Sequence, residues 1–181
     1  MKNYTILSLL VTGLLVSTGA LAQNEGDKAP GNGLPRAGSR SSGGPLGLGL
    51  SLGGPTGLTG KYYLSDSSGL SFGVGFGGHG WLSTHLDYVL SVANFSLGEA
   101  GSLYPYVGGG IGLGFLGGLG YGFGHPYTNI PVWADLHFTG GLGWNITNLP
   151  LDVFLEVAPG LAVLPGLGFA WHGIIGIRYY F

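Results

Sequence analysis

The final stretch of the chain, residues 170–181, alternates between two kinds of side chain at a period of two. One set is apolar or aromatic and comprises Trp171, Ile175, Ile177, Tyr179 and Phe181. The other set is mixed and comprises His172, Ile174, Gly176, Arg178 and Tyr180. Successive side chains of a β-strand point to opposite faces. The stretch therefore predicts a strand with one apolar, aromatic-ended face and one face that carries a charge, which is typical of transmembrane β-barrels.

The same period of two recurs from Leu46 onward, with turn-forming residues between the apolar runs. It predicts seven further strands, over residues 46–52, 58–64, 70–77, 82–90, 106–115, 132–144 and 151–157. The predicted fold class is all-β, an eight-stranded antiparallel transmembrane β-barrel over residues 46–181. The glycines of residues 108–124 could instead pack one helix against another, but their strict alternation with apolar residues favours a strand.

The composition excludes several other classes of protein. Only 8% of the residues are charged, against about 25% in ordinary soluble domains, and glycine or polar residues interrupt every apolar run after residue 22. Low charge without a spanning helix favours a closed barrel, because lipid offers no partners to unpaired backbone groups. The net charge of −2 and the lack of a basic stripe argue against nucleic-acid binding. The absence of cysteine excludes disulfides and thiolate chemistry.

Two segments precede the predicted barrel. Residues 1–22 have a short positive start, an apolar stretch and small residues before Gln23, which predicts a cleaved signal peptide for export through the inner membrane. An uncleaved anchor helix is the alternative, although the apolar stretch is short for a bilayer. Residues 23–45 are rich in Gly, Ser, Pro and Asn and predict a disordered periplasmic tail.

The position of the tail also predicts which end of the barrel faces the periplasm. If the tail and the C-terminus are periplasmic, the connections at residues 66–69, 94–103 and 147–150 are periplasmic as well. The connections at residues 53–56, 78–80, 116–131 and 165–166 then face outward. The longest connection, 116–131, falls on the outer side, as is usual for such barrels.

The inward positions of the predicted strands gather most of the ionisable residues of the barrel. This predicted polar network consists of Lys61, His85, Asp87, Asp135, His137, Asp152, Glu156, His172 and Arg178. An eight-stranded barrel has room for little more than its own side chains, so these charges must pair with one another. We expect Glu156 to pair with Arg178, and Lys61 to pair with Asp87 or another carboxylate. The lumen is therefore predicted to be polar and plugged, with a narrow ion path as the alternative.

Two motifs inside the predicted lumen allow other chemistry. His85 with Asp87, and Asp135 with His137, place an imidazole and a carboxylate on one strand face, which could bind a metal or respond to pH. Ser83 shares a face with His85 and Asp87, as a hydrolase would require. Any polar inward strand produces such spacings often. We therefore predict no catalytic residue, no cofactor and no metal, and keep a lipid-modifying enzyme as a further alternative.

The barrel region resembles a family of small outer-membrane β-barrels known from spirochaetes and other bacteria, and in architecture the eight-stranded OmpA and OmpX-type barrels. The resemblance rests on residues 54–64, 82–88, 151–159 and 176–181. A chain that ends on Tyr179-x-Phe181 also resembles outer-membrane proteins whose last strand is read by the assembly machinery. The resemblance implies this fold, a location in the outer membrane of a Gram-negative bacterium, and no reaction. We therefore expect a monomer in contact with the outer-membrane lipids and lipopolysaccharide, with a structural or surface-interaction role.

Overall fold

The structure is a computed structural model, and it describes residues 43–77, 82–115, 119–122, 125–128 and 132–181. Of residues 119–122 and 125–128 it describes the backbone alone. The predicted signal peptide, nearly all of the predicted tail and the predicted connection at residues 78–80 lie outside the described residues.

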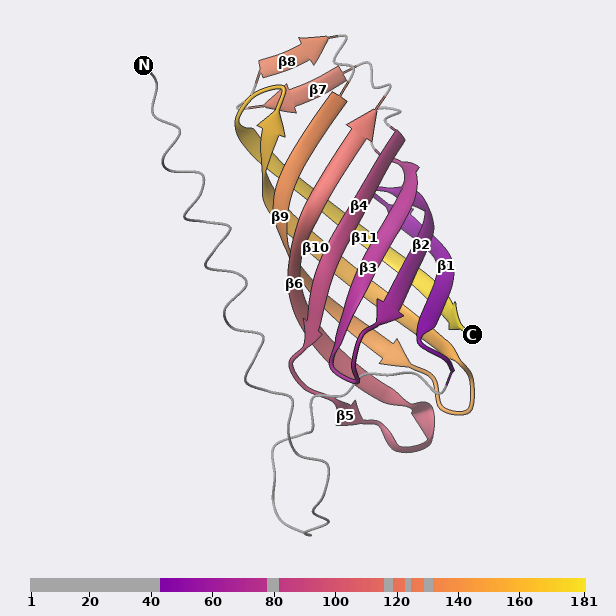
Figure 1. The fold of residues 1–181 in the computed structure, drawn as a ribbon. Helices are drawn as coiled ribbons and strands as arrows, with labels where there is room; N and C mark the ends of the chain where they lie inside the picture. Colours follow the sequence, from indigo (N-terminus) through magenta and orange to yellow (C-terminus); the bar gives the residue numbers. More distant parts are fainter. Residues whose placement is uncertain (1–42, 78–81, 116–118, 123–124, 129–131) are drawn as a thin grey trace. The chain divides into compact units, whose positions relative to one another are not determined.

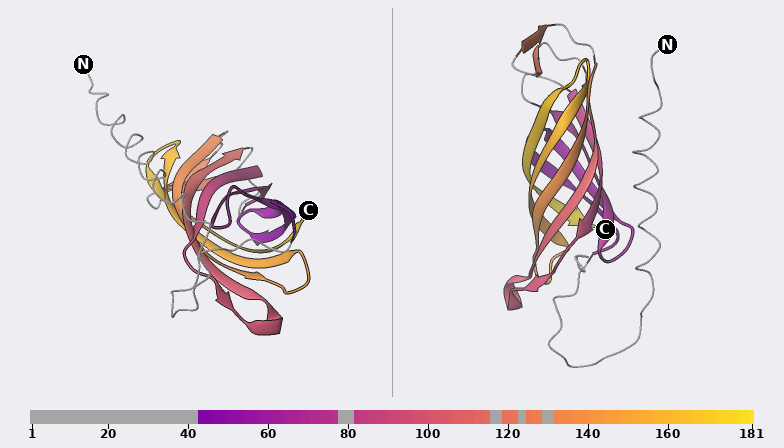
Figure 2. Two further views of the ribbon diagram at one scale, coloured as in Figure 1. Left: turned by 60° about the horizontal axis from the view of Figure 1, so that its bottom comes forward. Right: turned by 90° about the vertical axis from the view of Figure 1, so that its left-hand side faces the viewer.

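Eight long strands form the closed antiparallel barrel that the sequence predicts (Figure 1). They are β1 (Leu46–Gly53), β2 (Thr56–Tyr63), β3 (Ser68–Phe76), β4 (Leu82–Ser91), β6 (Ser102–Phe115), β9 (Val132–Asn145), β10 (Leu151–Leu164) and β11 (Gly168–Tyr180). Each strand pairs with the next of these in the chain, and β1 pairs with β11 to close the ring (Figure 2). The helical alternative for residues 108–124 is wrong as far as Phe115, because β6 pairs with both β4 and β9 along this stretch.

Two of the connections contain structure of their own. The segment between β4 and β6 holds the short strand β5 (Phe95–Ser96) and the 3₁₀ helix η2 (Gly98–Ala100), and β5 pairs with the first residues of β6. The segment between β6 and β9 holds a hairpin of β7 (Leu119–Gly122) and β8 (His125–Thr128). Among the described residues there is no helix long and apolar enough to cross a membrane.

Two strands extend beyond their predicted bounds and take in prolines. β10 continues past the predicted end at residue 157 to Leu164, and β6 begins at Ser102 rather than at Tyr106. Pro105 therefore lies inside a strand instead of at a break. The carbonyl oxygen of Pro105 accepts a hydrogen bond from the Val92 backbone N–H, beyond the last residue of β4. The ladder between β4 and β6 has ended at this point, so the missing N–H of Pro105 interrupts no pairing with β4, while Pro105 remains paired with Leu142 of β9.

The connections divide between two ends of the barrel. The C-terminal end holds the start of β1, the end of β11 and the connections β2–β3, β4–β6 and β9–β10 (Figure 1). The opposite end holds the connections β1–β2, β3–β4, β6–β9 and β10–β11. This division matches the two groups of connections that the sequence predicts.

The side chains of the strands sort by chemistry between the two faces of the wall. Large apolar and aromatic side chains are exposed on the outside of all eight strands. The barrel region, residues 43–181, contains eight Lys, Arg, Asp and Glu residues. Six of them are buried inside the barrel, namely Lys61, Asp87, Asp135, Asp152, Glu156 and Arg178. The other two, Asp66 and Glu99, are exposed in connections at the C-terminal end. The outer wall therefore presents no charged side chain on any strand.

Candidate functional site: the polar interior of the barrel

Arg178, on β11, is the centre of the polar interior near the C-terminal end. Its side chain is 1% exposed, and its guanidinium nitrogen Nη2 lies 3.9 Å from a carboxylate oxygen of Glu156. The guanidinium also donates hydrogen bonds to the hydroxyls of Thr59 and Ser71. The guanidinium carbon lies 3.6 Å from the centre of the Phe154 ring. The contacts of this one guanidinium thus connect β11 to β10, β2 and β3 inside the barrel.

The residues around Arg178 form a first polar layer. Three tyrosines donate hydrogen bonds to the two carboxylates of this layer, Asp152 and Glu156. The hydroxyls of Tyr104 and Tyr180 donate to the same oxygen of Asp152, at 2.5 and 2.8 Å. The hydroxyl of Tyr106 donates to Glu156 at 2.6 Å. Hydrogen bonds of this kind stabilise carboxylates that burial has removed from water. The predicted network omits these tyrosines, although Tyr180 shares a face with Arg178 in the alternation of the last strand.

Lys61 is placed differently from the prediction. Its ammonium nitrogen lies 4.6, 4.8 and 5.1 Å from the ring centres of Tyr63, Tyr104 and Tyr106. These rings attract the cation through their faces. The expected partner Asp87, on β4, is instead hydrogen-bonded to His137 and Thr139 of β9. The expectation of a Lys61–Asp87 pair is therefore wrong, because the tyrosine cluster occupies the space around the ammonium.

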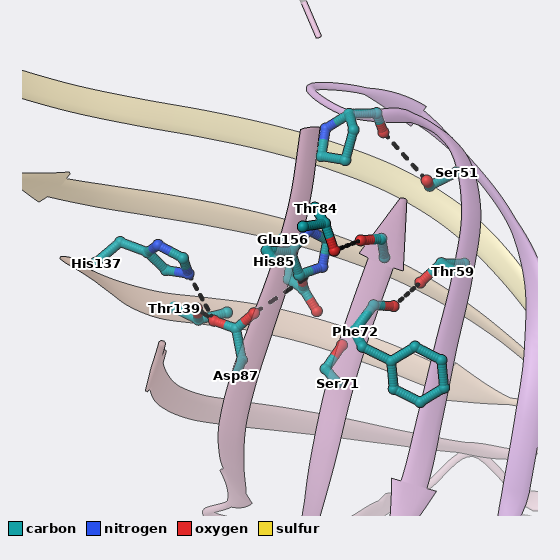
Figure 3. Close-up of polar contacts among 12 residues, drawn as sticks. Ser51, Thr59, Ser71, Phe72, Thr84, His85, Asp87, His137, Thr139 and Glu156 are labelled. Atoms are coloured by element: carbon teal, nitrogen blue, oxygen red, sulfur yellow. Dashed lines mark hydrogen bonds and ion pairs between the residues drawn. The ribbon is translucent and has the colours of Figure 1, made fainter. Parts of the chain in front are cut away.

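A second polar layer contains His137 between two carboxylates. Its Nδ1 lies 2.5 Å from Asp135 and its Nε2 lies 2.8 Å from Asp87. The hydroxyl of Thr139 donates to the same oxygen of Asp87 (Figure 3). These contacts join β9 to β4. The carboxylates of this layer are paired with histidine, whereas those of the first layer are paired with arginine and tyrosine.

His85 and His172 complete the second layer. The His85 ring stacks on the His172 ring at 5.8 Å between centres, and His137 meets His172 edge-on at 4.7 Å. His85 is 4% exposed and neither of its ring nitrogens has a hydrogen-bond partner. The nearest carboxylate oxygen is Oδ2 of Asp87, at 3.9 Å from Nε2. Because His85 has no hydrogen bond, the arrangement of Ser83, His85 and Asp87 that a hydrolase would need is not assembled.

All nine residues of the predicted network thus lie on the inner face of the barrel. Eight are buried, and His172 is partly exposed. Glu156 and Arg178 lie close together as expected. The nine residues form two layers, with His172 in the layer farther from the C-terminal end.

Glycines provide the space for the large inward side chains. Tyr104 lies opposite Gly143, Tyr106 opposite Gly141 and Phe154 opposite Gly176 on the neighbouring strand. The same relation holds for Tyr180 and Gly47, His85 and Gly73, Asp87 and Gly110, and Asp135 and Gly112. A Cβ atom added to any of these glycines would meet the facing side chain. The glycine-rich strands and the filled lumen are therefore two aspects of one packing pattern.

This pattern predicts opposite effects for two adjacent glycines. Gly141→Ala is expected to lower the free energy of unfolding by about 1–3 kcal/mol, because its Cβ would collide with the Tyr106 ring. Gly140→Ala is the matched control, since its Cβ would meet nothing within 4 Å, and it is expected to be neutral or stabilising by up to about 1 kcal/mol. Urea titrations of the detergent-folded variants measure both. Equal stability of the two variants would contradict the packing pattern.

Comparison of the chain with known protein families, with curated proteins and with solved structures finds no match to any of them. The resemblance to the outer-membrane barrel family stays a prediction.

Proposed function

We propose that the protein is an integral outer-membrane β-barrel with a sealed polar interior, and that it has a structural or surface-interaction role. The observation that supports it best is the separation of charge between the two faces of the wall. The outside of the strands carries exposed apolar side chains and no charge, while the six charged residues of the strands are buried inside. A soluble barrel has the reverse arrangement, whereas a lipid-facing barrel requires this one.

Aromatic side chains at both ends of the outer wall support the same proposal. Tyr62, Trp144 and Tyr179 are exposed near the C-terminal end. Phe169 and Trp171 are exposed near the opposite end. Aromatic rings at these two levels are characteristic of the boundaries between lipid and water. We further propose the orientation with the C-terminal end in the periplasm, where lipopolysaccharide would surround the opposite end.

A structural role is favoured over a pore by the way the first polar layer is filled. Arg178 contacts residues of β2, β3 and β10, and three tyrosines cover the two carboxylates beside it. These groups, including the partners Thr59 and Ser71, are all 0–2% exposed. An ion would have to displace this whole set of contacts in order to pass. A narrow channel remains the second candidate, because the layer is polar.

Single-channel recording in planar bilayers tests the sealed interior. Protein that has folded, as judged by heat-modifiable migration, is expected to give no steady conductance. Fractionation of cells that express the full chain is expected to recover it with the outer membrane. Discrete openings that change in Glu156→Gln would overturn the sealed barrel and favour the channel, and recovery outside the membrane fractions would overturn the location.

A further inference from the structure

The outer wall of the barrel is hollowed between β10 and β11, near the end opposite the C-terminus. This outer groove has a volume of about 370 Å³ and is lined by Val157, Ala158, Pro159, Phe169, Trp171 and His172. Two residues of β10, Val157 and Pro159, and two of β11, Phe169 and Trp171, have exposed side chains around it. The other two belong to inward-facing positions of their strands. The exposed lining of the groove is therefore apolar.

Gly173 provides space for the outer groove. It occupies an outward-facing position of β11, opposite Val157 of β10. Because it has no side chain, the outward side chains of Trp171 and Ile175 are about 13 Å apart along the strand. A Cβ atom added to Gly173 would lie 3.9 Å from side-chain atoms of Trp171 and Val157, and 3.6 Å from the Glu156 carbonyl oxygen. These are ordinary contact distances, so a side chain could occupy this space without strain.

The chemistry around the outer groove favours a hydrocarbon occupant. The connections at this end of the barrel, residues 54–55, 77–81, 116–131 and 165–167, contain no Lys, Arg, Asp or Glu. A phosphate or carboxylate would therefore find no charged partner there. Water needs about two to four polar partners, which the apolar side chains do not offer. An empty gap would lose van der Waals contacts on one side, so a flexible apolar chain is the occupant that gains most.

We propose that the outer groove binds one acyl chain of a surrounding membrane lipid, and that it recognises the chain rather than the head group. This inference rests on the proposed function, because only a membrane brings acyl chains against this wall. Pockets that bury a drug-sized ligand measure about 300–1,000 Å³, so a groove of about 370 Å³ has room for one chain but not for a complete lipid. Phe169 and Trp171 lie at the level where aromatic rings meet the lipid–water boundary. The head group would then lie beyond the groove.

Native mass spectrometry tests the proposal on the full chain, extracted with mild detergent from vesicles of phosphatidylcholine or of phosphatidylglycerol with the same acyl chains. The barrel is expected to retain one phospholipid, to the same extent with either head group. Gly173→Leu is expected to reduce the retained fraction at least threefold, because its side chain fills the outer groove. Trp171→Ala is expected to have a similar effect, since it removes an exposed wall of the groove. Trp171 is 72% exposed, so this variant keeps the test open if Gly173→Leu does not fold.

Gly140→Leu is the matched control. Gly140 lies opposite Val157 on the other side of β10, and its Cβ would meet nothing within 4 Å. This variant is expected to retain the lipid.

Four results would overturn the proposal: equal retention by Gly173→Leu and Gly140→Leu, retention that depends on the head group, retention of free fatty acid alone, or a dimer that Gly173→Leu dissociates. Protein that inserts into vesicles but retains no phospholipid would contradict the outer groove alone. Protein that does not insert would contradict the proposed function itself.

Discussion

Arg178→Met is expected to lower the free energy of unfolding by about 3–5 kcal/mol, which is the usual effect of removing one partner from a buried charge cluster. Methionine keeps much of the length of the side chain but neither its charge nor its hydrogen bonds. Glu156 would remain buried without the guanidinium beside it, and the hydroxyls of Thr59 and Ser71 would lose their donor. Urea titration of the detergent-folded protein measures the change.

Two further variants show whether the effect of Arg178→Met on stability comes from the lost charge or from lost packing. Glu99→Gln removes an exposed charge in a connection and is expected to change the stability by less than about 0.5 kcal/mol. The double variant Arg178→Met/Glu156→Gln is expected to be less destabilised than the sum of its two single variants, because it also removes the unpaired carboxylate. Strict additivity, or a stability close to that of the unaltered protein for Arg178→Met, would contradict the account of the first layer.

If the wall faces lipid, as proposed, Leu155→Arg is expected to destabilise the protein in lipid vesicles by about 2–4 kcal/mol, the cost of a cation near the middle of a lipid-facing strand. Leu155 is 54% exposed on β10 and lies between Leu142 and Ile175, which are also exposed. If water surrounded this face, the same substitution would change the stability by less than about 0.5 kcal/mol. Denaturant titration of the vesicle-bound protein measures the effect.

Leu97→Arg is the matched control for the lipid-facing position. Leu97 is 48% exposed and lies between β5 and η2, in a connection at the C-terminal end. Its substitution is expected to have little effect in vesicles, because the proposed membrane barrel has this connection outside the lipid. Similar small effects at Leu155 and Leu97 would contradict a lipid-facing wall.

The sequence predicted the number of barrel strands, and which side chains face inward, because both depend on a period of two. A residue such as Arg178 is assigned to the inner face by its position in the alternation alone, without knowledge of its partners. Once one face is buried, a shift by a single residue would expose every inward charge, so the alternation fixes the register strongly. The bounds of β6 and β10 were less predictable, because Pro105 and Pro159 are ordinarily signs of a break.

The contacts within the lumen could be predicted only in part. Glu156 and Arg178 could be paired because they lie on consecutive strands. The contact of Lys61 with the tyrosine rings depends on the stagger of strands that are far apart in the chain, as does the link between Asp87 and His137 across β4 and β9. The alternation along a strand predicts whether a side chain points into the lumen, but the closure of the barrel decides which of the inward side chains contact one another.

Tryptophan fluorescence in vesicles of brominated lipid tests the membrane-spanning barrel most directly, because brominated acyl chains quench only the rings that touch them. Trp171 is 72% exposed on the outer wall, whereas Trp133 is partly buried on the inner face. Single-tryptophan variants, with the other tryptophans replaced by phenylalanine, report each position separately. The account predicts strong quenching of Trp171 and little quenching of Trp133. Emission from Trp171 that is the same in brominated and ordinary lipid would contradict it.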